Sequence, residues 1–321
     1  MKHLNTKMFF ASVLSLMLVL NVSAQKKEIS KTFDAKEKLE ITTALGGIIL
    51  KQSPDSKIHL YITHNYDQGE FDLKVKEKSN KLELEEDLNV NDSDGKSSQW
   101  TVSIPQNCEV EFNSGTGSIT ANGLKGTVEG SSGTGGVEVN NCEGEFELSS
   151  GTGSVNVNNC SGEFEVSSGT GSVRVKSFSG ELEANSGTGK VVLEDSEGTF
   201  DANSGTGDCE AKNITIDVES EFNSGTGDAE VIAPKGSNFS LTIASGTGDA
   251  LLDMSGVPLE GYFEMTAHQR KGRIVSPEKF DNEEIIENGN DEKYDKKSFT
   301  KGSGSNKFYI KTGTGTAKLK K

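Results

Sequence analysis

Hydrophobic residues recur in pairs two positions apart along the middle of the chain, and the pairs repeat at a fixed interval. The tetrapeptide SGTG begins six times at intervals of 18 residues, then twice more after gaps of 20 and 21, at Ser114, Ser132, Ser150, Ser168, Ser186, Ser204, Ser224 and Ser245. Counted from that serine, positions 6, 8, 15 and 17 are apolar in nearly every copy, as in Val155, Val157, Phe164 and Val166. Apolar residues two apart indicate a strand with one buried face, so each repeat predicts two short strands and no helix.

The two strands cannot form one straight run, because their inside–outside alternation slips by one residue at two places in each repeat. One slip lies within SGTGS, and the other follows position 8, just before a nearly constant glycine at position 13. A straight strand keeps its phase, so each slip predicts a corner or bulge where glycine accepts unusual dihedral angles. We expect such dihedrals at Gly169, where valine would strain the backbone.

A fixed period with two strands and two corners predicts an all-β fold, a single-stranded β-solenoid whose 18-residue rungs stack their strands in register. Right-handed winding is the expectation for crossovers between parallel strands. Eight rungs spaced about 4.8 Å apart would make a rod of roughly 40 Å. A sandwich of β-hairpins is the alternative, but hairpins rarely keep so long a register.

Both ends of the chain fit the same template more loosely. LEITTALGGIILK from Leu39 and FYIKTGTGTAKLK from Phe308 align with a regular rung, and alternating strand patterns lie between Leu50 and Pro105. Residues 276–306 are rich in Asp, Glu, Lys and Gly, which predicts a loop or insertion. Irregular ends are expected to stop end-to-end pairing of rungs. The predicted segments are a signal peptide (1–24), irregular N-terminal β rungs (25–105), the regular SGTG solenoid (106–256) and a C-terminal β cap with a charged loop (257–321).

The first residues have the pattern of an export signal. Lys2 and Lys7 precede the apolar run MFFASVLSLMLVL, and small residues follow it, so we place cleavage after Ala24. The run is short for a membrane span and no second one follows, so we expect an exported chain in the periplasm or at the cell surface, without membrane insertion. The formal net charge of −16 makes nucleic acid and anionic lipid poor partners.

The export signal, the alternating strands and the stretch IPQNCEVEFNSGTGSITANG with its repeated glycine corners resemble a known family. This is the bacterial putative-adhesin family of β-strand repeats, a domain of unknown function. The resemblance runs from Leu39 to Leu319. It implies a β-solenoid at the cell envelope and supplies no catalytic residues.

We identify no catalytic, cofactor-binding or metal-ligating residue from the sequence. GTGK, which ends at Lys190, lacks the other residues of a phosphate loop. His59 and His64, five apart on a strand, face opposite sides and form no zinc site. The GTGD copies lack the spacing of calcium-binding nonapeptide turns; they end at Asp208, Asp228 and Asp249.

Several repeated polar residues have simple structural interpretations. Rows of like glutamates fit a solvated face better than acid/base pairs, because catalysis needs unlike groups in a cleft. A threonine row at the corners lacks the flat strands that an ice-binding lattice needs. The rows are Glu145, Glu163 and Glu181; Glu147, Glu165 and Glu183; and Thr134, Thr152, Thr170 and Thr188.

The cysteines leave one question open. Cys142 and Cys160 are one period apart and stack on adjacent rungs, so they could form a disulfide or a buried ladder of free thiols. Cys108 and Cys209 lie several rungs apart and are expected to stay unpaired.

Together these patterns predict a non-enzymatic, exported, adhesin-like or cell-envelope scaffold protein. It would bind an unknown glycan or envelope or surface protein through the side of the solenoid, where weak contacts add up. Two alternatives are a β-helix enzyme that acts on glycans, as a lyase or hydrolase, and a calcium-binding repeat protein. Only residues 276–306 offer room for the unlike side chains of an active site.

Overall fold

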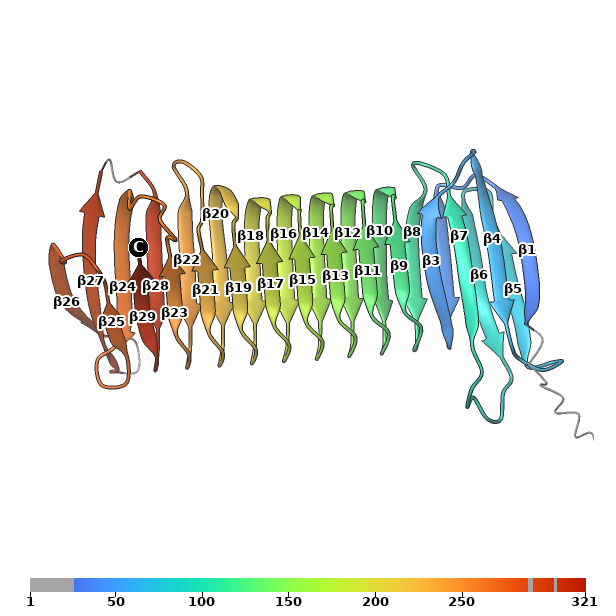
Figure 1. Cartoon of the computed structure of the whole chain (residues 1–321). Coiled ribbons are helices and arrows are strands. Elements are labelled where there is room, and N and C mark those ends of the chain that lie inside the picture. Colours follow the sequence, from blue (N-terminus) through green and yellow to red (C-terminus); the bar gives the residue numbers. More distant parts are fainter. Residues whose placement is uncertain (1–25, 288–290, 303–304) are drawn as a thin grey trace, which may run out of the picture.

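The computed structural model describes residues 26–287, 291–302 and 305–321, and the predicted signal peptide lies outside these residues. The described residues form an elongated rod built from strands alone (Figure 1). No helix in this part of the chain is long and apolar enough to cross a membrane.

Two sheets run along the rod, and successive strands of the middle rungs alternate between them. Sheet B contains the longer strand of each rung: β8 (Glu109–Ser114), β10 (Lys125–Ser132), β12 (Glu143–Ser150), β14 (Ser161–Ser168), β16 (Ser179–Ser186), β18 (Glu197–Ser204), β20 (Thr215–Ser224) and β22 (Ser240–Ser245). Sheet A contains the shorter one: β9 (Ile119–Asn122), β11 (Val137–Asn140), β13 (Val155–Asn158), β15 (Val173–Lys176), β17 (Val191–Glu194), β19 (Cys209–Lys212), β21 (Ala229–Ile232) and β23 (Ala250–Asp253).

The strands of neighbouring middle rungs pair in parallel. Paired residues of adjacent regular rungs, such as Asn140 and Asn158, are 18 positions apart in the sequence. Val155, Val157, Phe164 and Val166 are fully buried, as the alternation predicts. The core is therefore a set of columns between the two sheets, and the ring centroids of Phe146 and Phe164 are 4.6 Å apart. The all-β, solenoid-like architecture agrees with the sequence analysis, whereas the winding direction stays a prediction.

Glycine is required at the SGTG corner for a reason other than the predicted one. None of the glycines in the SGTG copies has a positive φ angle. Instead, the corners of adjacent rungs stack so closely that a Cβ atom on Gly169 would lie 2.4 Å from the carbonyl oxygen of Gly151. The prediction of unusual dihedrals at Gly169 is therefore wrong, and close backbone contact is the cause.

The second corner does have the left-handed backbone that the phase slip predicts. Asn141 and Asn159 have φ angles of 55° and 54°. The glycines that follow, Gly144 and Gly162, have φ angles of 141° and 124°. Asparagine tolerates this region better than most residues, which explains the polar pair at this corner.

The N-terminal end does not stack in chain order. Its strands are β1 (Lys27–Asp34), β2 (Lys38–Thr43), β3 (Gly46–Gln52), β4 (Lys57–His64), β5 (Phe71–Glu77), β6 (Lys81–Leu88) and β7 (Ser98–Ile104). β2 and β3 form a rung directly against β8 and β9. β4 to β7 lie beyond that rung, and the pairs β1–β4, β4–β7 and β5–β6 are antiparallel.

The C-terminal end is reordered in the same way. Its strands are β24 (Gly261–His268), β25 (Arg273–Val275), β26 (Asn282–Glu287), β27 (Lys293–Lys301), β28 (Lys307–Thr312) and β29 (Thr316–Lys320). β28 and β29 insert between the middle rungs and β24 and β25, so the last strands of the chain are not the last of the rod.

The composition of residues 276–306 predicts a loop or insertion, and the loop is wrong, because this segment contains β26 and β27. They form an antiparallel pair at the edge of sheet B, continuing from β24. Cross-strand ion pairs join Glu283 to Lys297 (2.8 Å) and Glu284 to Lys296 (3.1 Å). The charged composition that suggests a loop thus supplies the side-chain pairs of an exposed edge ladder.

Candidate functional site

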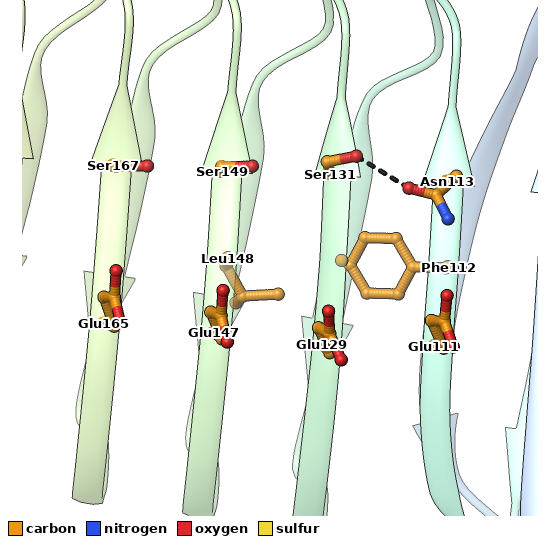
Figure 2. Close-up of a pocket in the computed structure, with 11 residues that line it drawn as sticks. Glu111, Phe112, Asn113, Glu129, Ser131, Glu147, Leu148, Ser149, Glu165 and Ser167 are labelled. Carbon is orange, nitrogen blue, oxygen red and sulfur yellow. Dashed lines mark hydrogen bonds between the residues drawn. The ribbon is translucent and has the colours of Figure 1, made fainter.

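The outer face of sheet B carries a group of like charges. Register places glutamates opposite one another on β10, β12, β14 and β16, in two rows two residues apart. Figure 2 shows part of the first row lying side by side on successive strands. We call these seven residues the carboxylate ladder: Glu129, Glu147, Glu165 and Glu183 in the first row, and Glu145, Glu163 and Glu181 in the second.

The ladder concentrates negative charge that no basic side chain among the described residues compensates. Adjacent strands are about 4.8 Å apart, so like charges in register repel. Ion pairs near the ladder, such as those of Lys125 and Lys176, go to other carboxylates, and none among the described residues involves a ladder glutamate. Burial, followed by the charges of Glu183 and Glu147, raises the pKa of Glu165.

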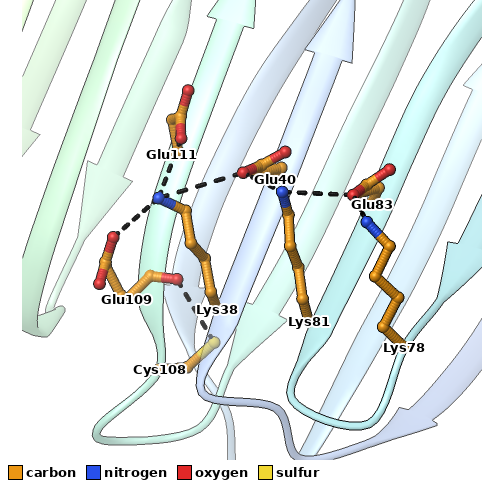
Figure 3. Close-up of polar contacts among 8 residues, drawn as sticks. All are labelled: Lys38, Glu40, Lys78, Lys81, Glu83, Cys108, Glu109 and Glu111. Atoms are coloured by element: carbon orange, nitrogen blue, oxygen red, sulfur yellow. Dashed lines mark hydrogen bonds and ion pairs between the residues drawn. The ribbon is translucent and has the colours of Figure 1, made fainter.

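The same rows are neutralised where they reach the N-terminal end. There the second row is occupied by Lys38 and Lys81 in place of glutamate (Figure 3). Hydrogen bonds from Lys78 and, to a smaller extent, from Lys81 lower the pKa of the Glu83 carboxyl to about 2. The ion pairs are Lys38 with Glu40, Glu109 and Glu111, Lys81 with Glu40 and Glu83, and Lys76 and Lys78 with Glu83.

A shallow groove follows the first row across β8, β10, β12 and β14. Residue 130 is glycine because the Phe112 ring of the neighbouring rung occupies the space that its side chain would take. A Cβ atom on Gly130 would lie 2.1 Å from that ring. Beside the carboxylates the groove is lined by small polar side chains, and the Ser131 hydroxyl donates to Asn113 Oδ1 at 2.8 Å. The groove therefore offers repeated carboxylate and hydroxyl groups, with no basic side chain among its lining residues.

The GTGD aspartates bridge successive corners. Asp208 Oδ1 accepts the backbone N–H of Asp228 at 3.0 Å, and Asp228 Oδ1 accepts that of Asp249 at 2.8 Å. Among the described residues, no group of three or more His, Cys, Asp or Glu side chains is placed to hold a metal ion. Lys190 of GTGK forms ion pairs with Asp208 (2.6 Å) and Glu210 (2.8 Å).

The serine of SGTG stabilises each corner by hydrogen bonding, a role that the sequence analysis missed. The buried Ser150 hydroxyl donates to the carbonyl oxygen of Gly135 at 2.8 Å and accepts the N–H of Gly153 at 2.8 Å. It thus joins its own corner to the preceding one. The threonines of SGTG, such as Thr152, are exposed at the corners, so they form no row on a flat strand.

The histidines and cysteines occupy separate structural positions. His64 is buried and His59 is half-buried beside Asp55, so they face opposite sides as predicted. All four cysteines are buried free thiols. Cys160 Sγ accepts the backbone N–H of Cys142 at 3.4 Å. A separate side-chain hydrogen bond between the two thiols, together with burial, raises the pKa of the Cys142 thiol.

A buried carboxylate terminates the corner stack at the N-terminal end. Glu86 accepts the backbone N–H groups of Ala44 (2.7 Å) and Leu45 (2.9 Å), and the Ser98 hydroxyl donates to it. In a middle rung the equivalent N–H, that of Gly133, bonds to the carbonyl oxygen of the preceding corner. The alternation of KLELEED places Glu86 on the inner face, a signal that the sequence analysis did not use.

Comparison with protein families now places this chain. The family model Toastrack DUF4097 matches residues 17–186 and 127–273, and the chain belongs to this family. No curated protein matches the sequence.

Solved structures that match this chain share little sequence with it. One, described as a putative adhesin from Bacteroides fragilis, is 17% identical, with 92% of this chain and 98% of that chain covered and a TM-score of 0.32. Another, a putative cell adhesion protein from Clostridium sporogenes, is 12% identical, with 92% and 99% covered and a TM-score of 0.27. A putative lipid binding protein from Parabacteroides distasonis is 12% identical, with 70% and 91% covered and a TM-score of 0.30.

Proposed function

We propose that this protein is a non-enzymatic, exported, adhesin-like or envelope scaffold protein that binds through the side of its rod. The carrying observation is the carboxylate ladder, which repeats one kind of group on successive rungs without compensating charge. An active site needs a few unlike groups converging at one place, whereas a repeated face suits weak contacts that add up. The partner is an envelope or surface protein, or a glycan, that presents positive charge or bridging cations to this face.

The right-handed winding expected for parallel crossovers belongs to the same proposal. So does the location, which is the periplasm or the cell surface. Protease treatment of intact cells decides between these two places, because only a surface protein is cleaved while the outer membrane is intact.

The binding test compares two variants with the same change in net charge. In the ladder variant, Glu129, Glu147, Glu165 and Glu183 are replaced by Gln. In the matched control, the same replacement is made at four glutamates on strands of sheet A: Glu138, Glu194, Glu210 and Glu230. We expect the ladder variant to lose binding to envelope fractions and the control to keep it. An equal loss of binding in both variants would indicate that binding depends on the net charge of the protein and not on the ladder. Unchanged binding in both variants would contradict binding through the ladder.

The enzymatic alternative has a direct test of its own. The mature protein is incubated with a panel of envelope and plant polysaccharides, and reducing sugar and unsaturated products are measured. We expect no turnover, and product release above that of a heat-denatured sample would overturn the proposal.

A further inference from the structure

Each of the two sheets has one edge strand at each end of the rod. β1 and β5 are the edges at the N-terminal end, and β25 and β26 are those at the C-terminal end (Figure 1). An open edge presents N–H and C=O groups that can pair with a further strand, and lysine or proline commonly blocks such pairing. β26 carries neither lysine nor proline. β1 carries Lys31, whereas Lys74 and Lys76 of β5 form ion pairs with Asp87 (3.0 Å) and Glu83 (3.8 Å) of the neighbouring strand β6, which leaves the open side of β5 accessible.

β26 also exposes apolar side chains. All of its six residues are exposed, and Ile285 and Ile286 are 58% and 37% accessible. Val275, the last residue of β25 at the same end of the rod, is 43% accessible. Exposed isoleucines on an unblocked edge are a feature that single-chain proteins usually avoid.

The opposite end of the rod has complementary side chains. Phe71, Leu73 and Val75 alternate along β5 and are only partly buried against the core. Asp72 and Lys74 lie between them and Lys76 follows Val75, and these charged side chains point to the other face of the strand. The three glutamates of β26 already form ion pairs with lysines of β27. The apolar positions are therefore what the two edges offer each other.

The strand directions also fit. β26 is antiparallel to β27, which is antiparallel to β24, so β26 runs in the direction of the middle strands of sheet B. β5 is antiparallel to β6, so it runs against that direction. One rod placed behind another therefore brings β26 beside β5 in the antiparallel orientation, the more stable type of pairing.

We propose that the protein assembles head to tail, with β26 of one copy pairing with β5 of the next copy. Sheet B then continues from rod to rod. The two contacting surfaces differ and the contact does not close on itself, so the product is a filament. A second copy is the occupant because the same chain carries both the exposed apolar edge and, at its other end, an edge of matching direction with a partly buried apolar row.

The test uses the full mature chain, residues 25–321, in a concentration series followed by light scattering and small-angle X-ray scattering. We expect the wild-type mass to rise beyond that of a dimer as the particle lengthens. Ile285→Lys, which places a lysine on the open edge, should remain monomeric. Val218→Lys is the matched control, since Val218 is 67% accessible on the side of the rod, and it should assemble like the wild type.

Mixing experiments establish which edges meet. Ile285→Lys added to wild type should shorten the filaments, because it blocks one end of each contact. Ile285→Lys and Val75→Lys should each be monomeric alone and form dimers when mixed, provided that circular dichroism shows Val75→Lys to be folded. A wild type that stays monomeric overturns the proposal. So does an Ile285→Lys variant that assembles like the wild type, or a folded Val75→Lys variant that assembles alone.

Discussion

The middle of the rod and its two ends differ most plainly in charge. Residues 106–256 contain 24 acidic and six basic residues, whereas residues 25–105 and 257–321 together contain 25 of each. The same outward rows are glutamate paired with glutamate in the middle and lysine paired with glutamate at the N-terminal end. The middle is therefore built to present charge, and the ends are built to neutralise it.

The two regions also differ in topology. Middle rungs follow one another in chain order, and the strands of sheet B pair in the same register from β10 to β18, before a bulge at β20. At both ends, a rung that matches the repeat lies against the middle, and strands that leave the pattern lie beyond it. Each middle rung is thus replaceable by its neighbour, whereas the terminal rungs have unique positions.

The largest expected effect tests that difference. Deleting Ser150–Ser167 removes one middle rung and should preserve a single cooperative unfolding transition. Truncation after Asn306 removes β28 and β29, which separate the middle from β24, and should release the whole C-terminal cap. Burial of Phe308, Ile310 and Leu319 contributes about 1.5–3 kcal/mol each, all of which is lost. Thermal unfolding by circular dichroism and limited proteolysis measure both variants, and equal damage from both would contradict the comparison.

The next prediction concerns the stacked corners of the middle. A Cβ atom on Gly153 would lie 2.4 Å from the carbonyl oxygen of Gly135, so Gly153→Val should lower the free energy of unfolding by about 3 kcal/mol. Gly136→Ser is the control, since the same place is serine in adjacent rungs, at Ser118 and Ser154, and should be nearly neutral. Denaturant unfolding compares them, and a neutral Gly153→Val would refute close corner stacking.

A smaller effect is expected where the corner stack ends. Glu86→Ala leaves the buried N–H groups of Ala44 and Leu45 without an acceptor and should cost about 2 kcal/mol. Glu85→Ala changes the adjacent exposed residue and should cost almost nothing. If the two variants have the same denaturation midpoint, Glu86 does not terminate the stack.

The smallest expected effect is the response to pH. The pKa of Glu165 is raised, so protonating it relieves repulsion and the middle gains stability as pH falls from about 7 towards 5. The pKa of Glu83 is lowered to about 2, so its contribution is present above its unfolded pKa and is lost as pH falls towards 2. The midpoint temperature should rise slightly and then fall. The ladder variant, in which Gln replaces Glu129, Glu147, Glu165 and Glu183, should lack the initial rise. A pH profile of its midpoint temperature equal to that of the wild type would contradict repulsion along the ladder.

The sequence predicts the middle well because its apolar positions repeat with two strand phases, and Val155 and Phe164 are buried as that pattern requires. The sequence does not reveal why residue 169 must be glycine, because the reason is its close contact with the backbone of the neighbouring rung. The strand β26 is missed because glutamate and lysine indicate a loop until the partner strand is known. The carboxylate rows follow from the period, but the absence of ion pairs to them in the described part of the chain depends on where each lysine side chain lies.

The central claim is that binding is distributed along the side of the rod. It is tested most directly with a series of variants that lack one, two and three middle rungs, beginning with Ser150–Ser167, each confirmed as folded by circular dichroism. Binding to envelope fractions is measured for each variant under the same conditions. The account predicts a stepwise loss of affinity with each rung removed, because similar weak contacts act together. Complete loss on removal of one particular rung from a folded rod would contradict it and indicate a single localised site.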